Sequence, residues 1–181
     1  GKSLLILGTG PIGCLMVNVA RVLGAARIVV ADINAERIEV ARKFGAEQGF
    51  IAGSEDFLQN ALDFSGGQGY DAVISACSDP TAHEGAIRLA AKGGYVNLFG
   101  GIARGMPDEI SFPQNLVHYR GITIGGSFSS TKAHLERAVD LLVSGKIMSA
   151  DIITHRFPLD EIGAGFETVG SQQGLKVVIN P

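Results

Sequence analysis

One short stretch near the N-terminus, LLILGTGPIG from Leu4 to Gly13, constrains the fold more than any other part of this sequence. Its four apolar residues are typical of a buried β-strand, and apolar residues recur at helical spacing from Ile12 onward. Pro11 suits the first residue of that helix, because the N–H that proline lacks would be unpaired there. The stretch therefore predicts a strand that runs through a glycine turn directly into a helix.

The same alternation of strand and helix continues along most of the chain. A second helix is expected after Asn34, which is a plausible N-cap, and Gly45 and Gly145 are expected at helix ends. Further helices are predicted over Glu55–Phe64, Thr81–Ala90 and Lys132–Ser144. The predicted strands are Ser3–Leu7, Arg27–Ala31, Gly49–Ala52, Ala72–Ser75, Tyr95–Phe99 and Ile122–Gly125. Alternation of this kind requires parallel strands with right-handed crossovers, so the sequence predicts an α/β fold with a doubly wound parallel sheet (a Rossmann fold) of about six strands.

Two segments break this rhythm. Gly100 to Gly121 contains Pro107 and Pro113 and shows no clear helix, and a loop of that length is usually functional or lies at an interface. After Gly145 the pattern indicates a strand, a short helix and a final strand outside the main alternation. We therefore expect a dinucleotide-binding domain over residues 1–145 and a C-terminal extension over residues 146–181.

The glycine turn matches the pattern G-x-G-x-x-G, with Gly8, Gly10 and Gly13 as its glycines. Because it follows a predicted strand and opens a helix, it is typical of a dinucleotide site. Gly8 would permit the tight turn, Gly10 would let a pyrophosphate approach the backbone, and Gly13 would let the helix pack closely on the sheet. The N-terminus of the helix then offers free N–H groups and partial positive charge to the phosphates.

Asp32, at the end of the second predicted strand, is the candidate for binding the adenosine ribose. A carboxylate at this position accepts hydrogen bonds from both ribose hydroxyls and repels a 2′-phosphate, which favours NAD over NADP. Asp32 could instead be a capping or turn residue. Arg37 leaves the preference open, since a guanidinium near the ribose could tolerate a 2′-phosphate or could equally be a solvated residue on a helix face.

Composition excludes several other classes of protein. The net charge of −3 comes from dispersed residues without a basic run, so nucleic acid and anionic membranes are poor partners. Residues 3–20 are uncharged, but the glycines and Pro11 within them argue against a membrane span. With two cysteines the chain has no disulfide framework, which favours the cytoplasm.

The residues that usually carry catalysis are weakly represented. None of the four histidines has metal-ligand spacing, and each is expected at the surface or an interface. Cys14 is expected in the core, and Cys77, which follows the fourth strand, is expected to line the cofactor pocket without a histidine to activate it. Nucleophile-elbow, P-loop and Tyr-x-x-x-Lys motifs are also absent. The sequence thus predicts a cofactor turn with neither a catalytic residue nor a metal ligand of its own.

Six segments, in this order, resemble the nucleotide-binding half of the zinc-dependent medium-chain alcohol dehydrogenases, and most of all the polyol (sorbitol-like) and threonine dehydrogenase branch. They are LLILGTGPIGCLMVNVARVLGA, VVADINAERIEVARKFGAE, DAVISACSDP, GGYVNLFGG, HYRGITIGGSFSST and IITHRFPLDEIGAGFE. The resemblance covers essentially the whole chain.

The resemblance implies a role for each matching residue along an extended NAD. Gly10, Pro11 and Ile12 would contact the pyrophosphate, Asp32 the ribose, Ile33 the adenine, and Arg37 would lie near the ribose. Further along the cofactor, the implied contacts are Ala76 and Cys77 at its middle, Phe99, Gly100 and Gly101 on the nicotinamide side, and Ser127 near the carboxamide. It also implies a homodimer in which two domains pair through Phe112–Gly126.

The resemblance further implies hydride transfer between a secondary alcohol or polyol and NAD. In that family the catalytic zinc and its ligands belong to an N-terminal domain, which this chain lacks, and the segment after Gly145 completes that domain. The chain, which begins without Met, is expected to be a piece that binds NAD(H) with little turnover. The alternatives are a non-catalytic NAD-sensing module and, less in keeping with the complete glycine motif, a methyltransferase that uses S-adenosylmethionine.

Overall fold

A computed structural model of the chain, which describes residues 1–147, 150–171 and 174–181, contains a six-stranded parallel sheet with strand order β3-β2-β1-β4-β5-β6. The strands of this sheet are β1 (Ser3–Leu7), β2 (Arg27–Asp32), β3 (Gln48–Ile51), β4 (Tyr70–Ser75), β5 (Ala90–Leu98) and β6 (Thr123–Gly126). The helices between them are α1 (Pro11–Val22), α2 (Ala35–Lys43), α3 (Phe57–Phe64), α4 (Pro80–Arg88) and α5 (Gln114–Arg120). This is the strand order of the dinucleotide-binding fold, and it confirms the predicted fold class.

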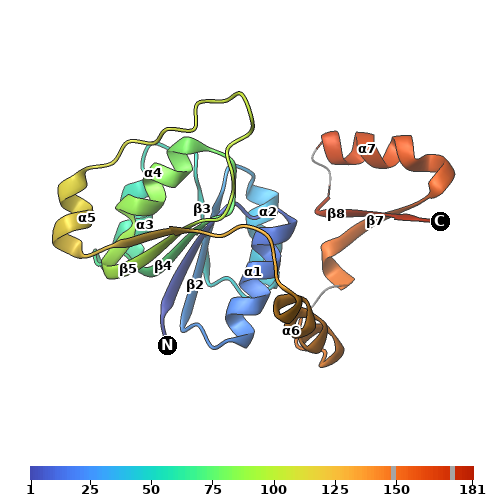
Figure 1. Cartoon of the computed structure of the whole chain (residues 1–181), viewed down its shortest axis with the longest axis horizontal. Coiled ribbons are helices and arrows are strands. Elements are labelled where there is room, and N and C mark those ends of the chain that lie inside the picture. The colour runs from blue at the N-terminus through green and yellow to red at the C-terminus, as the bar shows by residue number, and fades with distance from the viewer. Residues whose placement is uncertain (148–149, 172–173) are drawn as a thin grey trace. The chain divides into compact units, whose positions relative to one another are not determined.

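The helices cover both faces of the sheet. Figure 1 shows α1 and α2 on one face and α3, α4 and α5 on the other. Side chains that are almost fully buried, among them Leu5, Val29, Tyr70, Val73 and Ile87, form a core between the strands and the helices α3 and α4. A sheet covered on both faces needs apolar residues at successive positions, which is why β1 and β2 are nearly continuous apolar runs.

Local signals in the sequence placed several helix ends correctly. Pro11 opens α1 at its first position. Asn34 caps α2, with its Oδ1 accepting hydrogen bonds from the backbone N–H groups of Glu36 (2.8 Å) and Arg37 (3.3 Å). Gly45 follows that helix with φ of +115°, a conformation that favours glycine. The expected termini are confirmed at these positions because a cap involves only the residues next to it.

Two elements differ most from the prediction. The segment Gly100–Gly121, for which no helix was predicted, contains α5, a helix of seven residues that ends at Gly121 in the left-handed conformation. It is too short to show a helical period, and only a few of its side chains, such as Leu116 and Val117, pack on the core. Strand β5 begins at Ala90 rather than at Tyr95, because Ala90 pairs with Tyr70 before an irregularity in the register.

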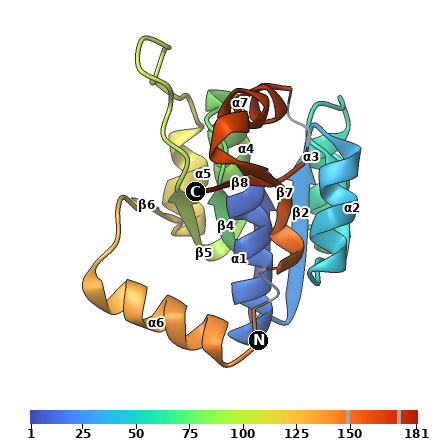
Figure 2. The same ribbon diagram turned by 90° about the vertical axis from the view of Figure 1, so that its right-hand side faces the viewer.

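The chain folds into two compact units, Gly1–Thr131 and Lys132–Pro181. The second unit contains α6 (Lys132–Val143), β7 (Ile153–Pro158), α7 (Ile162–Gly170) and β8 (Lys176–Asn180), besides two short 3₁₀ turns at Ala150–Ile152 and Leu159–Glu161. Strands β7 and β8 are parallel and α7 packs on them (Figure 2), so the predicted strand–helix–strand is confirmed. The boundary between the two units precedes α6, whereas the predicted domain boundary at residue 145 follows it; the boundary at 145 stays a prediction. Within the described ranges, every helix is too short or too polar to cross a bilayer.

The start of β1 is attached to β4 through the carboxylate of Asp71. Its Oδ2 accepts hydrogen bonds from the backbone N–H and the hydroxyl of Ser3, both 2.8 Å long, and its Oδ1 accepts one from Lys2 Nζ at 2.9 Å. The backbone hydrogen bond from Ser3, followed by the hydrogen bonds from the side chains of Lys2 and Ser3, lowers the pKa of Asp71 from 3.8 to about 2. The charged carboxylate therefore stabilises the fold.

We expect Asp71→Asn to lower the free energy of unfolding by about 1 kcal/mol at pH 7, a modest value because the side chain is 37% exposed. Since the pKa of the folded state is depressed, this stabilisation is complete above about pH 4 and is lost as the pH falls towards 2. Urea denaturation at pH 7 and at pH 2.5 measures both effects. Asp63→Asn, at a carboxylate that accepts a single exposed bond from Gln59, is the control and should change stability by less than about 0.5 kcal/mol. An equal loss at both pH values would contradict the role of the charge.

Candidate functional site

The ends of β1, β4 and β5 come together at the carboxyl edge of the sheet. The Gly8 N–H donates to the Ala31 carbonyl at 2.7 Å, the Ala76 N–H to the Leu7 carbonyl at 2.7 Å, and the Gly100 N–H to the Ser75 carbonyl at 2.8 Å. A side chain at Gly8 would meet Cys77 and the carbonyl of Ala76, and one at Gly100 would overlap the backbone of Cys77. Glycine at these two positions therefore allows three strand ends to pack backbone against backbone.

Beside these strand ends lies a cavity of about 530 Å³. It opens where the strand order reverses between β1 and β4, which is where sheets of this kind bind their ligands. Four of the predicted site residues line it: Gly8, Asp32, Ile33 and Cys77. The other lining residues lie in β1 and β2, follow β3 and β4, or lie in α3 and α4, and were not predicted: Leu7, Ala31, Ala52, Gly53, Ser54, Glu55, Phe57, Leu58, Asp79, Thr81, Ala82 and Gly85.

The N-terminus of α1 has no side-chain cap. Gly10 is its N-cap residue and Pro11 its first residue, so no side-chain oxygen accepts from the first turn. No heavy atom lies within 4 Å of the place that a side chain at Gly10 would take, whereas a side chain at Gly13 would overlap the carbonyl oxygen of Gly8. The turn therefore presents unpaired N–H groups and open space, as an anion site requires. The predicted contacts of Gly10, Pro11 and the half-exposed Ile12 with a pyrophosphate stay predictions.

Asp32 is 7% exposed, and protein donors already use most of its acceptor positions. Its Oδ2 accepts from the backbone N–H of Thr9 (2.6 Å) and from the Thr9 hydroxyl (2.9 Å), and its Oδ1 accepts from the Asn34 N–H (2.9 Å). A carboxylate offers about four acceptor positions, so one is left on Oδ1. Asp32, the last residue of β2, thus holds the glycine turn through Thr9 and is at the same time a carboxylate in the cavity wall.

Arg37 and the two cysteines complete the surroundings of the turn. Arg37 Nε is buried and has no hydrogen-bond partner among the described residues, so the guanidinium remains able to donate to a ligand. Burial, together with the charge of Asp32, raises the pKa of Cys14 to about 11, although the charge of Arg37 lowers it. Burial likewise raises the pKa of Cys77. Both thiols are therefore protonated at neutral pH.

The residues predicted on the nicotinamide side lie outside the lining of this cavity. Phe99 and Gly100 follow β5, where the Phe99 N–H, like that of Gly100, donates to the carbonyl of Ser75. Gly101 has open space around the position of a side chain. Ser127 follows β6, and its Oγ accepts a hydrogen bond from Asn97 Nδ2 at 2.8 Å. Their roles, like that of Ala76 at the end of β4, stay predictions.

His83 is a residue that sequence reasoning misplaced. We expected every histidine at the surface or an interface, but His83 is only 3% exposed. It lies in the first turn of α4, which Asp79 caps by accepting from the N–H groups of Thr81 and Ala82. The buried side of α4 contains His83, Gly85, Ala86 and Ile87. Ala86 and Ile87 follow His83 by three and four residues, so all three lie on the same face of the helix. This spacing was the signal that could have placed His83 in the core.

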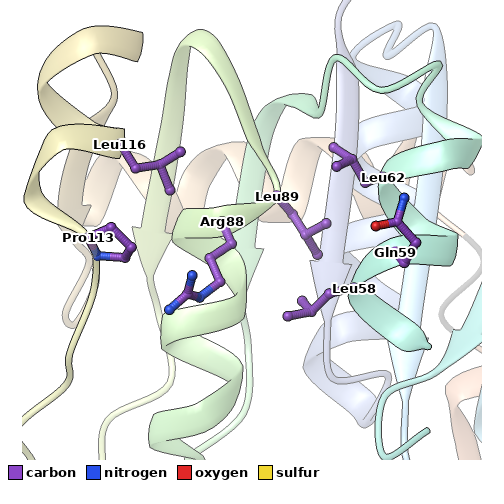
Figure 3. A pocket seen from close by; sticks show the side chains of 7 residues that line it. All are labelled: Leu58, Gln59, Leu62, Arg88, Leu89, Pro113 and Leu116. Carbon is purple, nitrogen blue, oxygen red and sulfur yellow. The ribbon is translucent and has the colours of Figure 1, made fainter. Parts of the chain in front are cut away.

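A second cavity, of about 240 Å³, lies between α3, α4 and α5 (Figure 3). Its walls are mostly leucine side chains and Pro113, with Arg88 and Gln59 as its polar members. Gln59 already donates to Asp63 at 2.7 Å. This cavity offers neither a glycine turn nor a carboxylate, so it is no candidate for a dinucleotide.

No group of three or more His, Cys, Asp or Glu side chains in the described part of the chain could hold a metal ion.

Comparison with known proteins supplies independent findings. The family model described as "Zinc-binding dehydrogenase" matches residues 11–144. L-threonine 3-dehydrogenase of Bacillus licheniformis is 34% identical over 185 residues, which cover 100% of this chain and 52% of that protein. A protein of Aspergillus clavatus assigned as D-xylulose reductase A is 34% identical over 184 residues, covering 99% of this chain and 50% of that protein. The chain therefore spans about half the length of these relatives.

Solved structures agree with the fold over the whole chain. An alcohol dehydrogenase from Thermotoga maritima superposes with a TM-score of 0.90 at 28% identity and covers 100% of this chain and 50% of that one. A proposed zinc-binding dehydrogenase from Sinorhizobium meliloti, bound to NADP, superposes with a TM-score of 0.91 at 27% identity, covering 100% of this chain and 53% of that one.

Proposed function

The chain belongs to the zinc-binding dehydrogenase family, and from this premise we propose that it is the NAD(H)-binding half of an enzyme that transfers a hydride between a secondary alcohol or polyol and NAD. The observation that carries the proposal is the uncapped N-terminus of α1, which lies beside the carboxylate of Asp32 at one edge of the sheet. Helix N–H groups suit a pyrophosphate and the carboxylate suits a ribose, so the two together match a dinucleotide.

The residues at this edge of the sheet suit the adenosine and pyrophosphate parts of such a cofactor. Ile33 offers an apolar surface for the adenine, Asp32 one acceptor position for the ribose, and Gly10 open space for the pyrophosphate. On the other side of the point where the strand order reverses, Cys77 and Gly100 are candidates for contacts with the nicotinamide half of the cofactor. When bound, the nicotinamide supplies the hydride acceptor, and this chain binds it, orients it and keeps water from the buried strand ends.

The substrate and the zinc are proposals that rest on the family. We propose that the zinc ligands come from another part of the enzyme, because this chain spans about half the length of its relatives and its described residues hold no candidate cluster. A zinc ion that polarises the alcohol would lower its pKa and so favour hydride loss. A secondary alcohol or polyol is proposed because the relatives include a threonine dehydrogenase and a protein assigned as a xylulose reductase.

We also propose a homodimer that forms through Phe112–Gly126, in the cytoplasm. Strand β6 is at one edge of the sheet, so its outer N–H and C=O groups are available for pairing with a second copy. The side chains of Tyr119 and Phe128 are largely exposed nearby. Sedimentation equilibrium of the chain measures the mass, and a monomer at micromolar concentrations would contradict the dimer.

Calorimetric titration of the chain with NADH and then with NADPH tests the cofactor assignment. We expect NADH to bind and NADPH to bind at least about tenfold more weakly, because the carboxylate of Asp32 repels a 2′-phosphate. Equal binding of NADPH would mean that attraction of the 2′-phosphate by Arg37 outweighs its repulsion by Asp32. No binding of either nucleotide would overturn the proposal. With a secondary alcohol and added zinc we expect little turnover, measured as NADH absorbance, since no described residue cluster holds the metal.

A further inference from the structure

Asn97 is an unusual residue for the interior of a parallel strand, because only one end of its amide has a hydrogen-bond partner. Its Nδ2 donates a hydrogen bond to the Oγ of Ser127 at 2.8 Å. Its Oδ1 is buried and has no hydrogen-bond partner among the described residues. A buried acceptor without a partner is destabilising, whereas valine, which has a similar size and suits a strand, would avoid that loss. The amide at this position therefore needs an explanation other than stability.

Strand register brings the side chains of Asn97 and Ser127 to the same face of the sheet. Asn97 lies opposite Gly125 in the parallel pairing of β5 with β6. Side chains two residues apart on a strand share a face, and Ser127, two residues after Gly125, directly follows the end of β6. Since Gly125 has no side chain, the amide of Asn97 reaches past it to the hydroxyl.

The direction of this hydrogen bond decides what Ser127 offers to a ligand. A serine hydroxyl has one donor hydrogen and two acceptor positions on its oxygen. Because the oxygen accepts from the amide of Asn97, the hydroxyl hydrogen is directed away from that residue. Ser127 is exposed, so a ligand can reach it. The pair therefore presents an oriented O–H donor at the end of β6.

This donor lies at the edge of the sheet along which the proposed site continues. Sheet order places Asp32 at the end of β2, Gly8 after β1 and Cys77 after β4, and the ends of β5 and β6 follow in that direction. A dinucleotide whose adenosine ribose lies at Asp32 and which crosses the reversal of strand order has its second nucleoside over the ends of β4 and β5. Phe99, two residues after Asn97, is 37% exposed there and offers an aromatic surface.

We infer that Asn97 is a positioning residue that orients the Ser127 hydroxyl to donate its hydrogen to the carboxamide oxygen of the nicotinamide. The inference rests on the proposed function. In the bound nicotinamide base, whose ring nitrogen is bonded to the ribose, the carboxamide oxygen is the hydrogen-bond acceptor and the carboxamide nitrogen is a donor. A hydroxyl fixed as a donor matches the oxygen, whereas a freely rotating hydroxyl would match either end of the carboxamide.

ADP-ribose, which has the whole cofactor except the nicotinamide, separates this inference from the proposed function. In Asn97→Val and in Ser127→Ala we expect NADH to bind about tenfold more weakly, and ADP-ribose to bind within about twofold of the unchanged chain. The double variant should also lose about tenfold in NADH affinity rather than about a hundredfold, because both substitutions remove the same oriented donor. Calorimetric titration measures all of these affinities.

Two further measurements distinguish orientation of the hydroxyl from support of the fold. Urea denaturation should show Asn97→Val to be at least as stable as the unchanged chain, since the substitution removes the unpartnered Oδ1. Asn97→Asp keeps the shape of the side chain, but its carboxylate accepts from the Ser127 hydroxyl and so reverses the hydrogen bond. NADH should bind this variant about tenfold more weakly too, and the fluorescence of bound NADH should change as it does in Ser127→Ala.

Each outcome of these titrations decides. If NADH and ADP-ribose weaken by the same factor in Asn97→Val, the residue supports the fold as a whole and the inference is wrong. It is also wrong if NADH binds Asn97→Val, Ser127→Ala or Asn97→Asp as tightly as the unchanged chain, or if the double variant loses about a hundredfold. Failure of the unchanged chain to bind ADP-ribose would instead overturn the dinucleotide site itself.

Discussion

Gly13→Ala is expected to loosen α1 from the sheet and to abolish measurable NADH binding. The added methyl group would overlap the carbonyl oxygen of Gly8, so the helix and the glycine turn must move apart. Overpacking of this kind lowers the free energy of unfolding by about 1–3 kcal/mol, and displacement of the helix N-terminus removes the proposed phosphate site. Urea denaturation and titration with NADH measure the two effects.

Gly10→Ala is the matched control, because the same methyl group meets nothing in the protein. No atom lies within 4 Å of its place, and φ at Gly10 is −63°, which alanine adopts readily. Stability should stay within about 1 kcal/mol of the unchanged chain. NADH binding should still weaken by at least about tenfold, since the methyl group occupies the space in which we propose that the pyrophosphate approaches the backbone. NADH binding of unchanged strength in Gly10→Ala would show that the phosphates lie elsewhere.

Asp32→Ala is expected to weaken NADH binding by about 10- to 100-fold, because hydrogen bonds to a charged acceptor contribute about 1.5–3 kcal/mol each. It should weaken NADPH binding much less, because removal of the carboxylate also removes the negative charge that repels a 2′-phosphate. The preference for NADH would then largely disappear. Calorimetric titration of both nucleotides against the unchanged chain and the variant measures the change.

Since Asp32 also organises the glycine turn, two further variants separate its roles. Thr9→Val removes the hydroxyl that donates to Asp32 Oδ2 but leaves the carboxylate in the cavity wall. We expect NADH affinity to fall by no more than about threefold there. Asp32→Asn keeps the shape of the side chain and removes its charge, so it tests the preference between nucleotides in a turn that still folds. A loss in Thr9→Val as large as that in Asp32→Ala would assign Asp32 to the turn alone.

Much of the fold could be predicted from the sequence because its elements depend on near neighbours. The strand over Ser3–Leu7 has the predicted bounds, and the N-cap at Asn34 forms as expected from one side chain and the N–H groups that follow it. Parallel order followed from the alternation of strands and helices, since a parallel crossover needs a helix between its strands. Short elements were less predictable: α5 has seven residues, too few for a helical period to stand out.

The candidate site likewise contains residues that could be predicted from the sequence and residues that could not. The glycine pattern and an acidic residue at the end of the next strand are visible in the sequence, because both lie within one strand–helix–strand unit. Apart from Cys77, the lining that follows β3 and β4 or lies in α3 and α4 was not predicted. Which of those residues face the cavity depends on the pairing of β1 with both β2 and β4.

Most strands and helices, the glycine turn, several helix ends and the candidate carboxylate could be predicted from the sequence, because these depend on the conformation and spacing of residues a few positions apart. The tertiary structure was needed to show that Thr9 occupies one oxygen of Asp32, that Gly8 and Gly100 pack against Cys77, and that His83 is buried. These contacts join residues on different elements. Their distances depend on strand register and on how closely each helix packs on the sheet, which no local pattern of residues contains.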